Sequence, residues 1–205
     1  MRFVAPLLLP AFLLATACAA PEPSPAQQKS VKENESVRQA EVDALKGWSK
    51  LFGAPDAAIG AANQFGFRAT PYASIGHLWQ STGGPVMIAG SQAEKPNTVS
   101  FAAEGPDGAN VDTIRFDLAT NDAATAPDAR KRMAAMVSDY LSRAGIEAET
   151  LLPAIELGTP TRGMIGETPY SIETLHALDG EAEHLVVTFI RSGASALTNR
   201  QTQGR

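Results

Sequence analysis

Residues 99–118, VSFAAEGPDGANVDTIRFDL, carry the clearest structural pattern in the chain. Apolar side chains alternate with polar or small ones on both sides of a turn-rich middle, as in Val99 and Phe101 before it and Phe116 and Leu118 after it. Such alternation is typical of a strand with one buried and one solvated face. The intervening EGPDGAN is rich in turn-forming residues, so the stretch predicts a β-hairpin. An antiparallel sheet is therefore expected at the middle of the fold.

Helical periodicity on either side of this hairpin predicts two longer amphipathic helices. Apolar side chains recur at helical spacing over residues 34–52 and again over residues 127–144, and each run is followed by a glycine that favours a helix end. The second run also begins with a proline–aspartate pair, which is common in a first helical turn. Shorter helical pieces are expected at residues 55–64 and 151–157.

Further strands are expected in the apolar segments at residues 67–79 and 85–89, with a turn at the glycine pair between them. Two last strands flank ALDGEAEH, and the second of them, residues 184–191, is almost continuously apolar. That composition favours a central strand covered on both faces. Together the elements predict an α+β fold with a mainly antiparallel sheet of about six strands in hairpins, packed against the two longer helices.

Two short segments resemble each other. TPYASIGHL begins at Thr70 and TPYSIETLHAL begins at Thr168, and each follows helical segments. An ancient duplication and a chance match of common residue types both explain this similarity, and the sequence leaves the two open.

The chain is expected to hold one globular domain at residues 33–192, followed by a flexible polar tail at residues 193–205. Residues 18–32 are rich in proline and lack a cluster of large apolar side chains, so they predict a disordered tether. Residues 1–17 have the layout of an export signal that is removed, with Arg2 before an apolar run. The run is about twelve residues long, short of the roughly 20 that a membrane-spanning helix needs.

The end of this signal, LATAC at residues 14–18, resembles the lipobox of bacterial lipoproteins. The resemblance implies diacylglycerol on the sulfur of Cys18, cleavage before it, and fatty acyl chains such as palmitate on the new amino terminus. It also implies an outer-membrane anchor facing the periplasm, because Ala19 rather than aspartate follows the cysteine. Cys18 is the only cysteine and has no intramolecular disulfide partner, which favours lipidation. The alternative is ordinary secretion after cleavage at Ala17 or Ala20.

Composition narrows the class of partner. The chain has 17 basic and 22 acidic residues, and this mild acidity argues against nucleic acid. The expected partners are the membrane, through the lipid anchor, and an envelope protein. The sequence contains no G-x-S-x-G, S-x-x-K or H-E-x-x-H motif and no phosphate-binding loop, so no catalytic residue and no cofactor are predicted.

The strongest candidates for metal ligands are His176 and His184, which bracket an acidic stretch. A three-residue loop between their strands would place them opposite each other, whereas a two- or four-residue loop would place them on opposite faces. Even the favourable case supplies two ligands, and a catalytic zinc usually has three. The pattern therefore predicts no metal site and names only these two candidates.

These observations predict a non-catalytic, lipid-anchored envelope protein with an interaction or envelope-maintenance role. The alternative is a periplasmic enzyme or ligand binder that acts on cell-wall or sugar material through His77, His176 or His184. A third possibility is a subunit of a larger envelope assembly, which a large exposed apolar patch would favour.

Overall fold

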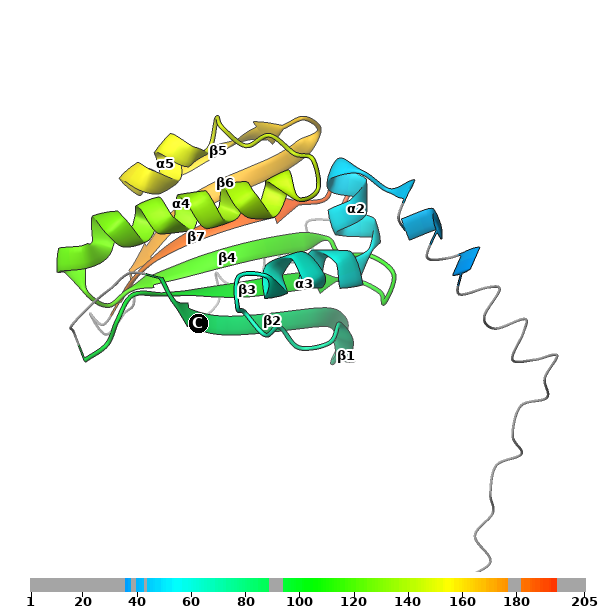
Figure 1. Cartoon of the computed structure of the whole chain (residues 1–205), viewed down its shortest axis with the longest axis horizontal. Helices are drawn as coiled ribbons and strands as arrows, with labels where there is room; N and C mark the ends of the chain where they lie inside the picture. Colours follow the sequence, from blue (N-terminus) through cyan, green and yellow to red (C-terminus); the bar gives the residue numbers. More distant parts are fainter. Residues whose placement is uncertain (1–35, 38–39, 43, 89–93, 177–181, 195–205) are drawn as a thin grey trace, which may run out of the picture. The chain divides into compact units, whose positions relative to one another are not determined.

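The computed structural model describes residues 36–37, 40–42, 44–88, 94–176 and 182–194. The chain divides into two units, Met1–Gln39 and Ala40–Arg205, and the fold that follows is that of the second unit. Its described residues form an antiparallel sheet with a layer of helices (Figure 1), which confirms the predicted α+β class.

The sheet has seven strands in the described part of the chain. They are β1 (Ala73–Ile75), β2 (Leu78–Met87), β3 (Thr98–Gly105), β4 (Thr113–Thr120), β5 (Thr161–Ile165), β6 (Thr168–His176) and β7 (Glu183–Ile190). Their order across the sheet is β1-β2-β3-β4-β7-β6-β5, and every neighbouring pair is antiparallel. The predicted number of about six is one short, because the sequence pattern does not reveal β5, a five-residue strand with a central glycine.

The hairpin expected at residues 99–118 is confirmed as β3 and β4. Phe101 lies opposite Phe116 and Val99 opposite Leu118, and all four side chains are buried. Side chains alternate across a strand, so the residues between them point to the other face. The register of β3 and β4 therefore determines which of their side chains enter the core.

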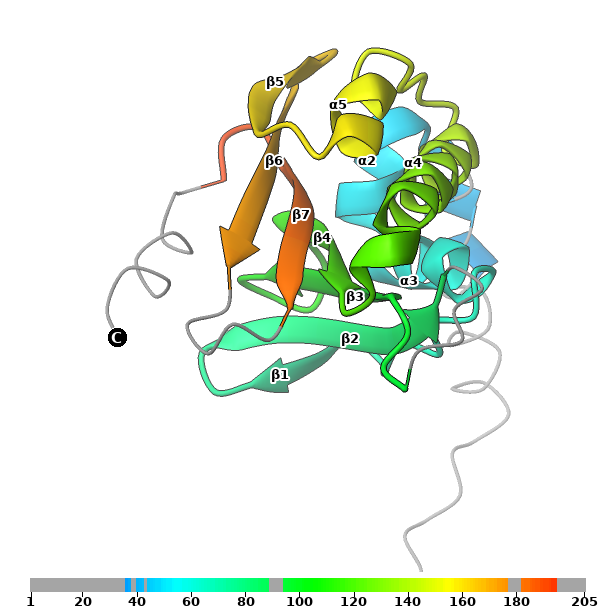
Figure 2. The same ribbon diagram turned by 90° about the vertical axis from the view of Figure 1, so that its left-hand side faces the viewer.

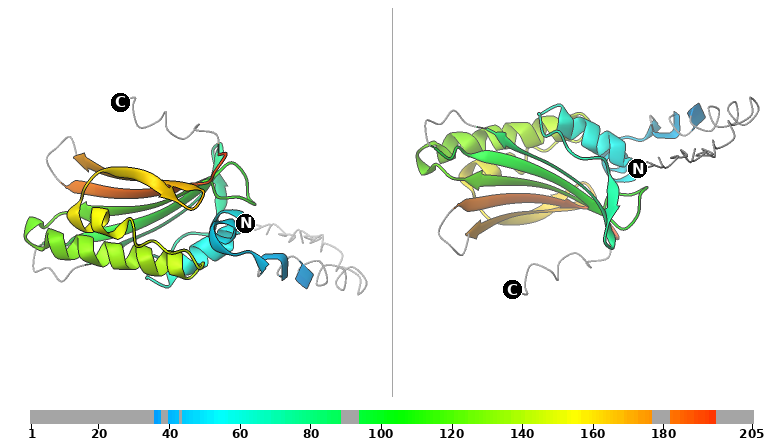
Figure 3. Two further views of the ribbon diagram at one scale, coloured as in Figure 1. Left: turned by 90° about the horizontal axis from the view of Figure 1, so that it is seen from above. Right: turned by 90° about the horizontal axis from the view of Figure 1, so that it is seen from below.

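The helices are α2 (Gly47–Gly53), α3 (Pro55–Asn63), α4 (Ala126–Ser142) and α5 (Leu152–Leu157), with a short 3₁₀ turn, η1 (Ala123–Thr125), before α4. Figures 2 and 3 show all four helices on one side of the sheet. The helix predicted near residues 127–144 is confirmed as α4, whose 17 residues make it the one long helix of the described part.

The helix predicted over residues 34–52 is helical at most of the positions that the structure describes, but it is interrupted. Leu45 and Lys46 are not helical, and α2 begins only at Gly47. Gly47 has a φ of 57°, which glycine adopts without the steric cost that other residues bear. Its N–H donates to the carbonyl oxygen of Ala144 at 2.8 Å and so ties the start of α2 to the end of α4.

Aromatic rings fill the core between the helices and the sheet. The Phe101 and Phe116 rings are 5.5 Å apart, and Tyr140 of α4 lies 5.0 Å from Phe116. Phe67 completes the cluster, 5.7 Å from Phe101. At the β5 end, the indole N–H of Trp48 donates to the Ile165 carbonyl at 3.0 Å. The burial of these side chains is the main source of stability for such a domain.

The final strand is central, as predicted, and among the described residues helices lie over one of its faces. β7 lies between β4 and β6, and its core-facing residues Leu185, Val187 and Phe189 are buried under the helices. The described part of the chain places no helix over the opposite face (Figure 2). We call this uncovered side of the sheet the open face.

The glycine pair expected to make a turn lies instead inside β2, where the pairing with β3 shifts between Gly83 and Val86. The segment before β1 runs close beside this bulge, because the N–H of Gly84 donates to the Phe67 carbonyl at 2.7 Å. A Cβ on Gly83 would lie 2.9 Å from the Cα of Ala69, which leaves no room for a side chain. Close approach of two backbones, rather than reversal of the chain, explains this glycine.

The two TPY segments occupy unrelated places in the fold. Thr70 precedes β1 and bonds to the edge of β2 through Thr82, whereas Thr168 begins β6 and pairs with Ile165. The β3–β4 and β6–β7 hairpins instead have matching registers, so one constant shift in residue number relates β3 to β6 and β4 to β7. The similarity of the TPY segments therefore does not mark equivalent positions.

Candidate functional site: the open face of the sheet

The centre of the open face is polar. Its side chains come from every second position of the inner strands, where they alternate with the buried core residues. The central polar residues are Ser100 on β3, Arg115 and Asp117 on β4, Thr188 on β7, and Ser171 and Glu173 on β6.

A contact between a carboxylate and an imidazole joins the two hairpins across this face. The Nδ1 atom of His184 lies 2.7 Å from the Oδ1 atom of Asp117. The register places His184 opposite Ala119 and Asp117 opposite Val186, so the pair is diagonal across β4 and β7. Both side chains keep about a third of their exposure, 35% for His184 and 31% for Asp117, and are accessible to a partner.

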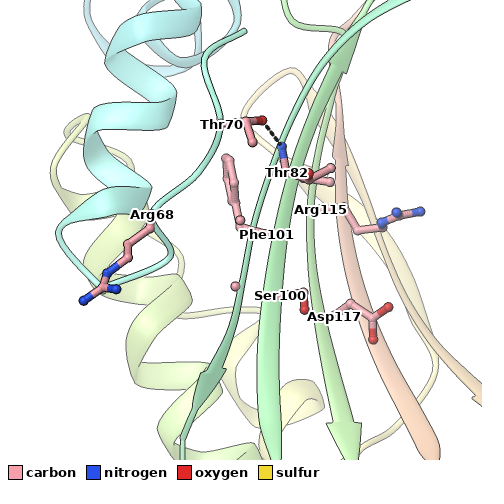
Figure 4. Close-up of a pocket in the computed structure, with 10 residues that line it drawn as sticks. Arg68, Thr70, Thr82, Ser100, Phe101, Arg115 and Asp117 are labelled. Carbon is pink, nitrogen blue, oxygen red and sulfur yellow. Dashed lines mark hydrogen bonds between the residues drawn. The ribbon is translucent and has the colours of Figure 1, made fainter. Parts of the chain in front are cut away.

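Arg115 lies next to this pair. It is two positions from Asp117 on β4, so both side chains leave the strand on the same face, as Figure 4 shows. The Arg115 side chain is exposed and forms no hydrogen bond or ion pair with any residue that the structure describes. An exposed guanidinium with five donors is suited to a carboxylate supplied from outside the domain.

The arrangement of hydroxyl, carboxylate and imidazole does not match a hydrolytic triad. A triad places the histidine between the nucleophile and the carboxylate. Here Ser100 lies directly opposite Asp117, and the carboxylate stands between the serine and His184. The residues fit a polar binding surface better than a nucleophilic site.

Apolar side chains surround the polar centre. The described part of the chain has eight exposed large apolar side chains, and the strand registers place six of them on the open face. These six are Ile75, Leu78, Met87, Met164, Leu175 and Ile190, which we call the apolar rim. Exposed apolar side chains that gather on one face of a domain often mark an interaction site, whereas single ones scattered over the surface do not.

A hollow of about 400 Å³ lies beside the β2 bulge. Its lining includes Thr82, Ser100, Arg115 and Asp117, together with Arg68 from the segment before β1. Figure 4 shows Arg68 extending away from Arg115 and Asp117 on the other side of the strands. The charged groups of the lining therefore do not converge on one point, as they do in a typical active site.

The structure separates the two metal-ligand candidates. His176 pairs with Glu183, and His184 pairs with Leu175, so the two histidines lie on opposite faces of the β6–β7 hairpin. His77 lies far from both along the sheet, in the exposed turn between β1 and β2. Within the described ranges no group of three metal-ligating side chains occurs. The acidic loop between the two histidines, including Asp179 and Glu181, lies outside the described residues.

The tip of the β3–β4 hairpin is held by turn chemistry. The Asp107 carboxylate accepts the N–H groups of Ala109 and Asn110, each at 2.8 Å. These bonds and the Asn110 side-chain amide hold the pKa of Asp107 below its usual value. The Tyr72 hydroxyl donates to the Asn110 carbonyl at 2.7 Å, and burial raises the pKa of that hydroxyl. This cluster positions the hairpin rather than a ligand.

The predicted lipidation site, Cys18, lies outside the described residues, as do the rest of the predicted export signal and the predicted tether. None of the helices in the described part combines the length and the apolar character needed to cross a bilayer. No family model, curated protein or solved structure matches the chain.

The sequence reading missed Arg115, Asp117 and Ser100 as site residues. The sequence does contain a signal for these three residues, because they occupy the polar positions of the hairpin that alternate with Phe101 and Phe116. The partner of Asp117, His184, lies 67 positions further along the chain in another hairpin, and the pairing of β4 with β7 brings the two side chains together.

Proposed function

We propose that the protein is a lipid-anchored, periplasm-facing binding protein of the bacterial envelope, without catalytic activity, that engages its partner through the open face. The lipobox resemblance at residues 14–18 and the proline-rich stretch at residues 18–32 support anchoring through Cys18 on a tether. The acidic net charge supports a protein partner over nucleic acid.

The observation that carries the binding role is the composition of the open face. Six exposed large apolar side chains surround a polar centre on the face of the sheet that carries no helix of the described part. Protein interfaces combine apolar contact area with polar and arginine side chains in this way. An enzyme acting on cell-wall or sugar material is the less favoured function, because Asp117, His184 and Ser100 lack the order of a triad and the hollow lacks convergent charges.

Intact mass of the membrane-extracted protein tests the anchor. We expect the wild type to carry acyl mass on Cys18, and Cys18→Ala to lose both this mass and membrane association. An unacylated start after Ala17 or Ala20 would contradict anchoring and make the protein a secreted one.

Site-specific photo-crosslinking tests the binding face. A benzoylphenylalanine at Thr188 reports on the open face, and one at Lys131 of α4 is the matched control on the helix layer. We expect discrete protein adducts from position 188 alone. Equal adducts from both positions would contradict the assignment of the open face as the binding surface.

A further inference from the structure

We infer that the partner at the open face is a second copy of this chain, with the two sheets packed face to face about a two-fold axis. This inference rests on the proposed binding role of the open face and names its occupant. The arrangement is a β-sandwich formed between two molecules, in which sheets stack about 10 Å apart with their strands nearly aligned.

The size of the face is sufficient for a stable dimer. Strands lie about 4.8 Å apart and each residue advances about 3.3 Å, so the five long strands present a flat area on the order of 600 Å². Side chains and the two short edge strands, β1 and β5, enlarge the accessible area beyond this figure. A standard interface buries about 800 Å² on each partner, which a face of this size supplies.

The charges on β4 are self-complementary. A two-fold axis that crosses the strands between Arg115 and Asp117 places each Arg115 over the partner's Asp117. Because a two-fold contact is reciprocal, the same pair forms twice. Asp117 engages His184 through Oδ1, which leaves Oδ2 available to the arginine of the other copy. The interface thereby supplies the partner that Arg115 lacks among the described residues of its own chain.

The same axis brings apolar rim residues into contact. It exchanges the two ends of each strand, so Leu175 at one end of β6 comes to lie over the partner's Pro169 and near the partner's Met164 at the other end. On β7, Ile190 lies over the partner's His184 in the same way. The two-fold axis thus buries Leu175 and Ile190 of both copies. This burial of apolar surface is the main driving force for association.

Two terminal segments of the same chain are poorly suited to cover this face. Residues 195–205, SALTNRQTQGR, contain one large apolar side chain, Leu197, and residues 19–35 contain one, Val31. Neither segment supplies enough apolar area to cover the six residues of the rim. A second open face has the matching area, the matching charges and its own rim.

The test is photo-crosslinking at Thr188 in the anchored, full-length protein, with two differently tagged copies expressed together. We expect an adduct at twice the mass of the chain that contains both tags, and none from the Lys131 control. Arg115→Asp alone opposes two aspartates across the interface, and Asp117→Arg alone opposes two arginines. Each is expected to reduce its own homodimer adduct more than about tenfold, because like charges in contact cost several kcal/mol.

Co-expression of the Arg115→Asp chain with the Asp117→Arg chain provides the decisive complementation. In that mixed dimer both contacts again join opposite charges, so the mixed adduct is expected to recover to near the wild-type yield. Recovery also shows that both variants are folded. Homodimer yields unchanged by either substitution, or no recovery in the mixture, would overturn the assigned packing.

Two further outcomes separate this inference from the proposed function. An adduct from Thr188 with a different protein and none with a second copy would overturn self-association and leave the binding role of the open face intact. Adducts of equal yield from Thr188 and Lys131 would overturn both.

Discussion

Replacing the buried Tyr140 with phenylalanine is expected to stabilise the folded protein. The Tyr140 ring packs 5.0 Å from Phe116 and 6.1 Å from Phe101, and both contacts survive the substitution. The change removes only the hydroxyl, which is fully buried and has no hydrogen-bond partner among the described residues. In the unfolded chain the same hydroxyl is hydrated, so folding removes hydrogen bonds from it without replacing them.

A buried polar group without a partner costs about 1–3 kcal/mol. The substitution leaves a small void where the oxygen was, which offsets part of the gain. We therefore expect the free energy of unfolding to rise by about 1 kcal/mol. For a domain of this size, such a change corresponds to an increase in Tm of about 2–4 °C.

Urea unfolding of the full chain, followed by circular dichroism, measures the change in free energy if the slope with denaturant is unaltered. Tyr72→Phe is the matched control, because it removes the same atom from a hydroxyl that donates to the Asn110 carbonyl at 2.7 Å. That variant is expected to lose about 1 kcal/mol. The two substitutions should therefore shift stability in opposite directions.

A loss of stability in Tyr140→Phe comparable to that in Tyr72→Phe would refute the reasoning. It would mean that the Tyr140 hydroxyl has a hydrogen-bond partner in solution, such as a buried water.

Three further outcomes are expected. Gly83→Ala should lower the free energy of unfolding by about 2 kcal/mol, since the new Cβ would meet the Ala69 backbone at 2.9 Å. Gly60→Ala on α3 is the control, because its new Cβ enters open space, and it should raise the free energy of unfolding by about 0.5–1 kcal/mol. A loss of stability in both variants would contradict this reasoning. The depressed pKa of Asp107 contributes stability above its unfolded value of 3.8 that is lost as pH falls, so unfolding midpoints of Asp107→Asn should decline less in acid than those of the wild type. Burial raises the pKa of Tyr140 above its ordinary 10.0, so the wild type should lose stability as pH rises beyond that value, and Tyr140→Phe should lose less in the same titration.

The elements that the sequence predicts correctly are those whose pattern is local. Alternation over residues 99–118 predicts β3 and β4 because each residue's face follows from its position alone. The apolar stripe of α4 is likewise visible at helical spacing. The interruption at Leu45 and Lys46 escapes a periodicity argument, because the next residue, Gly47, donates its N–H to Ala144, almost one hundred positions away in the chain.

The open face cannot be predicted from the sequence for a related reason. An apolar run such as residues 184–191 fits a strand covered on both faces, and only the placement of all helices on one side shows that Val186 and Thr188 face outward. The bulge at Gly83 is similar, since a glycine pair satisfies a turn and a close backbone approach equally well. The Asp117–His184 pair depends on which strands become neighbours, and local pattern does not determine that.

The last strand of the chain occupies the middle of the sheet, and this has a consequence for how the protein is made. β7 separates β4 from β6, so neither half of the sheet has its inner neighbour until the residues up to Ile190 have emerged. During synthesis from the amino terminus, the inner edges of β4 and β6 therefore stay unpaired until β7 is made, and unpaired edges are the parts of a sheet most prone to aggregation. Closing the β4–β7 ladder also requires a long-range contact, the slow class of folding event. Emergence of β7, rather than growth of the amino-terminal part of the chain, sets the moment at which this sheet becomes whole.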